Sequence, residues 1–241
     1  MDDLTTESLF NGRITIRQPA SGYRYAIDAV ILAHAAALKP GARACDIGTG
    51  CGIIPLVMAY RDPAIKEITG IEIQPRLAGI AGSNVLRNRM ESRIRIICHD
   101  AKNLTPEDTK GKFDRIVCNP PHQPQNAARV NPAMEKALAR HEIALTLEDL
   151  LSAAGRLLVP DGGLMMIYPA SRIADVLYRM RERGIAPKAL RFVHTAMGKD
   201  AKRVIVEGVL GGGPGTTVTS PLFLTDDKGR NTPELDAMFS E

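Results

Sequence analysis

The sequence predicts one α/β domain built around a seven-stranded, mostly parallel sheet with helices on both faces. From residue 43 onward, short apolar runs alternate with longer amphipathic stretches, which is the pattern of consecutive βαβ units. A chain of 241 residues is long enough to bury a sizeable core within one such domain. We expect residues 43–210 to form this core, residues 1–42 to precede it as a covering segment, and residues 211–241 to follow it as a polar tail.

Each predicted strand is a short apolar run bounded by turn residues. The strands are expected at residues 43–47, 67–73, 94–98, 113–118, 163–168, 190–194 and 203–209. The helices are expected at residues 53–60, 75–89, 146–158 and 171–183, with a last short helix at 233–239. Pro75 suits a first helical turn, Thr146 suits an N-cap and Gly184 suits a helix end. The polar segment 123–136 is expected to be a loop that orders over a substrate.

Composition and the first residues indicate a protein of the cytoplasm. Hydrophobic residues make up 44% of the chain and charged residues 24%, and no apolar run approaches the roughly 20 residues that cross a bilayer. The chain starts with Met1-Asp2-Asp3, and the apolar stretch of a secretory signal does not follow. We therefore expect no membrane partner and a cytoplasmic location.

The spacing of cysteine and histidine residues gives no support to a metal centre. Cys45, Cys51, Cys98 and Cys118 form no Cys-x-x-Cys pair, so we interpret them as buried small apolar residues. The five histidines form no His-x-x-x-His pair. A net charge of +4 is compatible with a nucleic-acid partner but does not require one. The oligomeric state stays open.

A glycine-rich turn separates the first predicted strand from the first helix. It reads Asp46-Ile47-Gly48-Thr49-Gly50-Cys51-Gly52. Gly48, Gly50 and Gly52 permit a sharp turn and leave room for a ligand at the N-terminus of a helix. Glu72 ends the second strand 26 positions after Asp46, with Ile73 beside it, and its carboxylate can accept both hydroxyls of a ribose. A tight turn without a ligand and a nicotinamide dinucleotide site are both compatible with these features.

The charge of Asp46 distinguishes a dinucleotide from S-adenosyl-L-methionine as the ligand of this site. A carboxylate at that position would repel the phosphates of a dinucleotide, whereas it would attract the ammonium and sulfonium groups of S-adenosyl-L-methionine. Asp100 ends the third strand, where it can accept a hydrogen bond from the amine of an adenine, and Ala101 offers a backbone donor next to it. The alternative for Asp100 is a cap of a helix or turn. These residues favour S-adenosyl-L-methionine as the cofactor.

The tetrapeptide Asn119-Pro120-Pro121-His122 follows the fourth predicted strand and carries a possible chemistry. The side-chain oxygen of Asn119 and the carbonyl of Pro120 can together accept both hydrogens of a planar NH2 group. The nitrogen lone pair then points toward a methyl sulfonium, so no strong base is needed. A proline-rich stop to the strand, without a ligand, is the alternative interpretation. We predict that these residues orient an amine for methylation.

Taken in order, these motifs resemble the class I amino-group methyltransferases, which have a Rossmann-like fold and an Asn-Pro-Pro motif followed by Tyr or Phe. A narrower similarity, to the bacterial valine-tRNA adenine N6-methyltransferases, extends over nearly the whole chain and is carried by residues 18–33, 45–56, 70–74 and 140–150. The resemblance implies that residues 1–42 cover the cofactor and that Tyr25 and Asp28 form part of its wall. It also implies a tRNA partner, with an adenine beside the anticodon as the substrate.

His122 departs from the pattern of this family, which places Tyr or Phe there to stack on the flipped base. An imidazole has a smaller face and can carry charge, so stacking on adenine is expected to be weaker or different. Three functions therefore stay open. They are methylation of an adenine in tRNA, methylation of another planar amine such as an RNA base or a protein glutamine, and RNA interaction by a cofactor-binding protein that has lost catalysis.

Positive charge concentrates in the turn between the last two predicted strands, residues 198–203. Lys199, Lys202 and Arg203 could contact the phosphates of a bound RNA, or they could form a solvated tip. A second group of basic residues surrounds position 90 and comprises Arg87, Arg89, Arg93 and Arg95.

Overall fold

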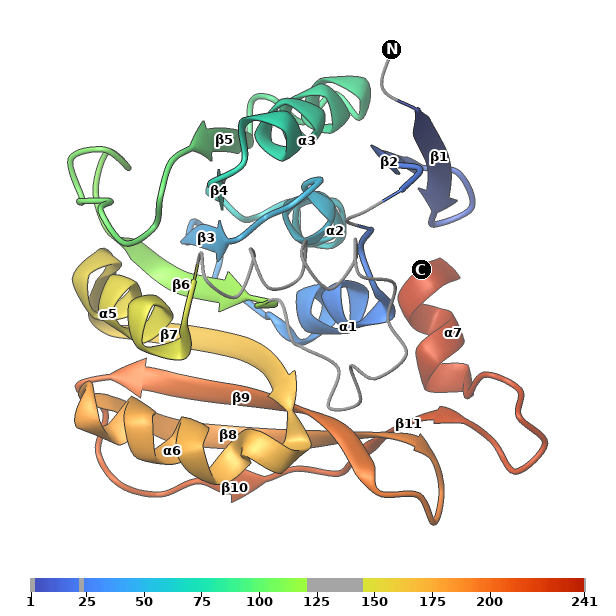
Figure 1. The fold of residues 1–241 in the computed structure, drawn as a ribbon, viewed down its shortest axis with the longest axis vertical. Coiled ribbons are helices and arrows are strands. Elements are labelled where there is room, and N and C mark those ends of the chain that lie inside the picture. Colours follow the sequence, from blue (N-terminus) through green and yellow to red (C-terminus); the bar gives the residue numbers. More distant parts are fainter. Residues whose placement is uncertain (1–2, 22–23, 121–144, 241) are drawn as a thin grey trace.

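Helices lie on both faces of one large sheet in the computed structural model (Figure 1), which describes residues 3–21, 24–120 and 145–240. The strands of the sheet are β3 (Arg43–Ile47), β4 (Glu67–Glu72), β5 (Ile94–Cys98), β6 (Phe113–Cys118), β7 (Leu158–Pro169), β8 (Ile185–Ala196), β9 (Ala201–Leu210), β10 (Thr217–Val218) and β11 (Leu222–Thr225). The helices are α1 (Ile27–Ala35), α2 (Ile53–Arg61), α3 (Pro75–Arg87), α5 (Leu147–Leu157), α6 (Ile173–Glu182) and α7 (Pro233–Ser240), with a short 3-10 turn η2 (Ala170–Arg172) before α6. No helix within the described residues is long and apolar enough to cross a bilayer.

The order of the strands reverses beside β3. The order is β10-β8-β9-β7-β6-β3-β4-β5, with β11 also paired to β8, and β9 is antiparallel to its two neighbours β7 and β8. After β3 the chain builds β4 and β5 on one side, and it then crosses over to build β6 on the other side of β3. Such a reversal opens a ligand-binding crevice at the carboxyl ends of the strands. The predicted ends of β3, β4, β5 and β6 therefore meet at the place where a site is expected.

Alternating side chains divide the interior into two hydrophobic clusters, one on each face of the sheet. Helices α1, α2, α3 and α7 pack on the first face, and α5 and α6 pack on the second (Figure 1). In β6, Val117 belongs to the first cluster, whereas Ile116 and Cys118 belong to the second. This alternation is the period of two that a strand buried on both faces requires.

All seven predicted strands are present, but the sheet has nine strands in the described part of the chain. The two additional strands, β10 and β11, come from the segment that we expected to be a polar tail. They lie parallel to β8, and α7 docks behind them with Leu235 and Met238 buried. Thr217 and Val218 are exposed, so their pairing depends on the edge of β8 and leaves no apolar pattern in the sequence.

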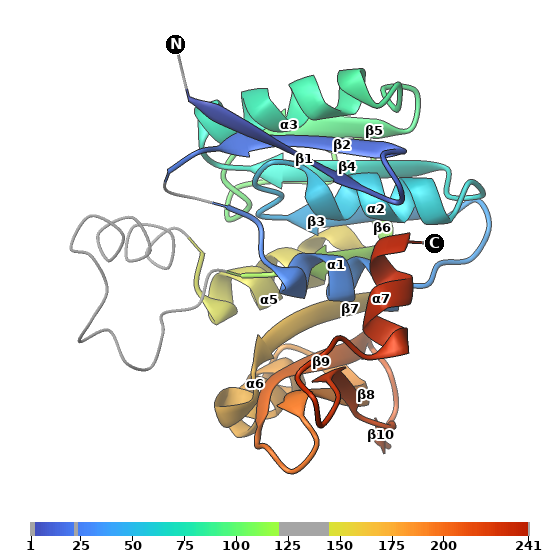
Figure 2. The ribbon, with the colours of Figure 1, turned by 90° about the vertical axis from the view of Figure 1, so that its right-hand side faces the viewer.

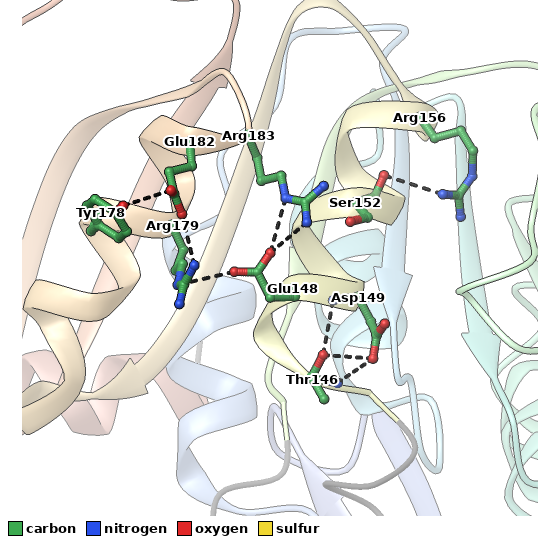
Figure 3. A network of polar contacts seen from close by, with 9 residues as sticks. All are labelled: Thr146, Glu148, Asp149, Ser152, Arg156, Tyr178, Arg179, Glu182 and Arg183. Atoms are coloured by element: carbon green, nitrogen blue, oxygen red, sulfur yellow. Dashed lines mark hydrogen bonds and ion pairs between the residues drawn. The ribbon is translucent and has the colours of Figure 1, made fainter.

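Local signals placed most helix ends correctly. The N-cap at Thr146 is confirmed, because Thr146 and Asp149 form a reciprocal capping box at the start of α5 (Figure 3). Helix α3 ends at Arg87, two residues earlier than expected, and Arg89 adopts a φ of +57°. The interpretation of the cysteines holds for Cys45, Cys51 and Cys118. It is wrong for Cys98, which is exposed at the end of the edge strand β5.

The covering segment contains a hairpin, β1 (Leu4–Leu9) and β2 (Ile14–Pro19), which lies beside α3 (Figure 2). Two asparagines, Asn84 in α3 and Asn88 immediately after it, make the hydrogen bonds to β2 that a neighbouring strand would otherwise make. Asn84 accepts from the amide of Arg17 (2.9 Å) and donates to its carbonyl (2.8 Å), and Asn88 does the same for Thr15 (2.8 and 2.7 Å). Asn84 and Asn88 are four positions apart and so lie on the same side of the helix, just as Thr15 and Arg17, two positions apart, lie on the same side of the strand. The hairpin is fixed to the body of the protein by these four bonds.

Candidate cofactor and catalytic site

The glycine-rich turn after β3 has the backbone shape that only glycine adopts at little cost. Gly48, Gly50 and Gly52 have φ angles of +78°, +58° and +85°. The amides of Gly48 and Thr49 donate to the carbonyl of Ile71 at 2.8 and 2.9 Å, which ties the turn to β4. Gly52 precedes the first turn of α2. The turn therefore presents backbone groups at the N-terminus of α2, where a ligand can approach closely.

Glu72 lies at the end of β4 and is 4% exposed. Its Oε2 accepts the amide of Gly50 at 2.9 Å, and its Oε1 accepts the amide of Gln74 at 3.0 Å. These two bonds fix the orientation of the carboxylate against the glycine turn. Oε1 also accepts a long hydrogen bond from the side-chain amide of Gln74 (3.5 Å), whereas Oε2 has a second lone pair that remains able to accept a hydroxyl of a ribose.

Asp46 lies in β3 between Gly70 of β4 and Val117 of β6, and it is fully buried. Neither carboxylate oxygen has a hydrogen-bond partner in the described part of the chain. Burial raises the pKa of this carboxyl to about 7; the nearby Thr49 hydroxyl opposes the shift without completing a hydrogen bond, and the charge of Glu72 adds to it. A buried unpaired carboxylate costs several kcal/mol. A cationic ligand would remove this cost, so the site fits the ammonium and sulfonium of S-adenosylmethionine better than a pyrophosphate.

Asp100 follows β5 at the same edge, because Glu72 pairs with Cys98 across β4 and β5. Its Oδ1 accepts the amide of Lys102 at 3.0 Å, and its Oδ2 lies 3.7 Å from the Lys102 ammonium. The turn cap that we considered as an alternative is therefore present, and a role toward adenine stays a prediction. Ala101 is buried beside Asp100, and Ile73 is exposed beside Glu72.

The catalytic corner begins at the end of β6. Asn119 is half-buried, Pro120 is buried, and Asn119 lies two positions beyond Val117, which pairs with Asp46. The sheet thus brings the Asn119 amide to the edge that carries Asp46 and Glu72. Pro121, His122 and the segment 123–136 lie outside the described residues.

Tyr25 and Asp28 are both held by protein partners. The hydroxyl of Tyr25 donates to Oε2 of Glu7 at 2.7 Å, and burial together with this carboxylate raises the pKa of the hydroxyl. The guanidinium Nε of Arg203 donates to Oδ2 of Asp28 at 2.8 Å, and the Asp28 side chain is 14% exposed. Arg203, for which a phosphate contact was one of the two alternatives, is therefore already paired with a carboxylate of the protein. No pattern in the sequence pointed to Glu7, and no local pattern pairs residues 28 and 203.

Comparison with known proteins identifies the family of this chain. The family model described as methyltransferase small domain matches residues 27–178. A tRNA1(Val) (adenine(37)-N6)-methyltransferase of Porphyromonas gingivalis is 35% identical over 81% of this chain and 78% of its own length. An enzyme of the same name from Aeromonas hydrophila is 32% identical over 74% of this chain and 73% of its own.

A solved structure from Agrobacterium tumefaciens, described as a predicted O-methyltransferase, superposes with a TM-score of 0.70. It is 20% identical and the match covers 88% of this chain and 94% of that one, which shows the fold. The predicted Rossmann-like class I fold is thereby confirmed. The chain belongs to the methyltransferase small domain family, a family of S-adenosylmethionine-dependent methyltransferases, and within it to the relatives named tRNA1(Val) (adenine(37)-N6)-methyltransferase.

Proposed function

We propose that this protein transfers a methyl group from S-adenosylmethionine to the exocyclic amine of an adenine in tRNA. The observation that carries the proposal is the placement of Asn119-Pro120 at the end of β6, on the strand next to Asp46 of β3, whose carboxylate has no hydrogen-bond partner among the described residues. The names of the relatives support tRNA as the partner and adenine as the base. We propose further that residues 1–241 act as one methyltransferase domain and that the reaction takes place in the cytoplasm, where tRNA is found.

The residues of this site have distinct tasks. Asp46 faces the cationic part of the cofactor and Glu72 accepts the ribose hydroxyls. The adenine end of the cofactor lies near Ile73, Asp100 and Ala101, and Tyr25 closes the site from the covering segment. When bound, the cofactor supplies an electrophilic methyl group. These residues contribute position and charge, and none of them needs to act as a strong base.

Asn119 and Pro120 orient the amine that is methylated. The Oδ1 atom of Asn119 and the Pro120 carbonyl accept the two amine hydrogens, which turns the nitrogen lone pair toward the methyl carbon. With the amine held in this way, the bound cofactor would supply the methyl group, and the electron pair of its methyl–sulfur bond would stay on sulfur. The nitrogen then loses one proton to solvent, so the product is a secondary amine. His122 stacks on the adenine in this proposal.

Cofactor binding and catalysis are tested separately. Glu72→Ala should weaken the binding of S-adenosylmethionine by about 2 to 4 kcal/mol in calorimetry, because two charge-assisted hydrogen bonds are lost. Bulk tRNA from a strain that lacks the protein should accept labelled methyl groups from the purified enzyme, and mass mapping should find N6-methyladenosine. Cofactor binding without methylation of tRNA would favour an RNA-interaction protein or another amine as the substrate.

His122→Tyr tests the identity of the base. If His122 is a stacking platform for adenine, tyrosine should maintain or raise activity on tRNA, by an amount that matches roughly 1 kcal/mol of stacking. A loss of activity would mean that the imidazole makes a hydrogen bond to a different substrate.

A further inference from the structure

The carboxylate of Glu7 in β1 contacts several polar side chains near the start of α1. Its Oε1 accepts the amide of Gln18 at 2.7 Å and forms an ion pair with Arg24, and its Oε2 accepts the hydroxyl of Tyr25 at 2.7 Å. Three donors from two segments therefore converge on one carboxylate. This carboxylate is 17 and 18 positions away in sequence from Arg24 and Tyr25, and it contributes nothing directly to the proposed reaction.

Gln18 connects the side chain of Glu7 to the backbone of Tyr25. It is 1% exposed, and both ends of its amide are used. The Nε2 atom donates to Glu7, and the Oε1 atom accepts the backbone amide of Tyr25 at 3.0 Å. The backbone and the hydroxyl of Tyr25 are thus fixed by two residues of the hairpin, which restricts both the position and the rotation of its ring.

The hairpin itself is anchored to the glycine turn. Asn84 of α3 is fully buried, and its amide donates to the Arg17 carbonyl of β2 and to the Cys51 carbonyl in the turn (2.8 and 2.9 Å). One asparagine therefore connects the strand that carries Gln18 with the loop that approaches the cofactor. The path from this loop through β2 to Tyr25 consists of hydrogen bonds between buried or half-buried groups.

We propose that Glu7 and Gln18 are positioning residues for cofactor binding, which act by fixing Tyr25 over the site. The inference rests on the proposed role of Tyr25 in the cofactor wall. If the hydrogen bonds from Glu7 and Gln18 select one conformation of Tyr25, the loss of these bonds lowers the fraction of protein that is ready to bind the cofactor. The apparent dissociation constant rises by the inverse of that fraction, whereas turnover at saturating cofactor is unchanged.

The primary test compares Glu7→Gln with Glu148→Gln. Glu148 of α5 has the same side-chain exposure as Glu7, 39%, and it also pairs with more than one side chain, Arg179 and Arg183 (Figure 3). In calorimetric titrations with S-adenosylmethionine, Glu7→Gln should weaken binding by about five- to twentyfold. Glu148→Gln should bind within twofold of the parent. On tRNA, Glu7→Gln should raise the KM for the cofactor and leave kcat within twofold.

A spectroscopic readout follows Tyr25 itself. The chain has five tyrosines, so 3-fluorotyrosine labelling gives few fluorine resonances, and Tyr25→Phe assigns the one of interest. Without cofactor, Glu7→Gln should shift or broaden the Tyr25 resonance, and saturating cofactor should restore it.

Tyr25→Phe removes only the hydroxyl that donates to Glu7, so it tests these hydrogen bonds in a protein whose fold is least disturbed. It should weaken cofactor binding two- to fivefold.

The outcomes separate this inference from the assignment of the site. If Tyr25→Ala and Glu7→Gln both bind the cofactor as the parent does, Tyr25 does not line the site and the proposed wall is wrong. If Tyr25→Ala weakens binding but Glu7→Gln and Tyr25→Phe do not, Tyr25 is confirmed in the wall and the positioning role of Glu7 and Gln18 is overturned.

Discussion

Two pairs of carboxylates, one on each side of the site, differ in what they contact. Asp46 and Glu72 lie at the carboxyl edge of the sheet, where Glu72 accepts hydrogen bonds from amides of Gly50 and Gln74 but pairs with no cation, and Asp46 has no hydrogen-bond partner within the described chain. Glu7 and Asp28 belong to the N-terminal segment, and both are paired with arginines, Arg24 and Arg203. The first pair is available for a ligand, whereas the second pair is committed to the protein.

This difference shows how the two regions divide their work. A buried carboxylate without a partner lowers the stability of the folded protein, as is expected at a site that is built to bind a cation. A paired carboxylate fixes the segment that carries it. In the function that we propose, the sheet edge provides the chemical groups of the site, and the N-terminal segment determines where the cover of the site lies.

The largest effect is expected from Asp46→Asn in the absence of cofactor. Burial raises the pKa of Asp46 from 3.8 to about 7, so between these pH values the unfolded chain releases a proton that the folded protein retains. Stability is therefore lost as pH rises through this window, by up to roughly 4 kcal/mol, and stays lower above it. The amide cannot ionise, so the variant should be more stable than the parent at pH 8. Urea denaturation at pH 5 and pH 8 measures the difference, which should be smaller at pH 5.

Asp28→Asn is the matched control for this experiment, because the Asp28 carboxylate already has a cationic partner. It should not become more stable at pH 8. Cofactor binding should also release a proton from Asp46 near pH 7, which calorimetry in buffers of different ionisation enthalpy detects. If the parent and Asp46→Asn release the same number of protons on binding the cofactor, Asp46 does not ionise when the cofactor binds.

Asn119 is in neither pair of carboxylates, and the substitution Asn119→Ala tests the methyl-transfer step separately from cofactor binding. It should lower the methylation rate by about a hundredfold or more, because it removes an acceptor that orients the reacting nitrogen. Cofactor affinity should stay within a few-fold of the parent. Single-turnover rates with saturating cofactor, together with calorimetry, check both expectations. Unchanged turnover would remove the corner from the mechanism.

A smaller effect is expected from the ion pair that fastens α1 to β9. In a double-mutant cycle, Asp28→Asn and Arg203→Met should show a coupling energy of about 0.5 to 1 kcal/mol in denaturation experiments, because Arg203 is about one-third exposed and partly screened. The single variants should weaken cofactor binding to the same extent as the double variant. Additive effects on stability would mean that the two residues act independently.

The smallest effect concerns the turn between β8 and β9. Lys199 and Lys202 are exposed there, whereas Arg203 is paired with Asp28, so the first two are changed without the third. Replacing both lysines with alanine should weaken tRNA binding and lower its salt dependence by up to about two ion equivalents. Binding titrations at several salt concentrations measure the slope. An unchanged slope would direct the search to Arg87 and Arg89, since Arg93 and Arg95 already donate to backbone carbonyls.

Local chemistry in the sequence was enough to predict the centre of the sheet and the residues at its edge. The apolar runs gave the strands from β3 to β9, and Gly48, Gly50 and Gly52 gave the turn, because each requires a positive φ whatever surrounds it. Parallel strands that are joined by crossovers end at the same edge. For this reason, Asp46, Glu72 and Asn119 could be assigned to one site without a structure.

Only the tertiary structure determined how the two ends of the chain are used. The hairpin β1–β2 is held by asparagines in and just after α3, β10 and β11 add to the edge of β8, and Asp28 pairs with Arg203 across 175 positions. Each of these contacts joins residues that are far apart in sequence, and none of them imposes a periodic pattern on the residues around it. The state of Asp46 is decided in the same way, because its raised pKa comes from burial by neighbouring strands and from Glu72, and neither effect exists until the sheet has formed.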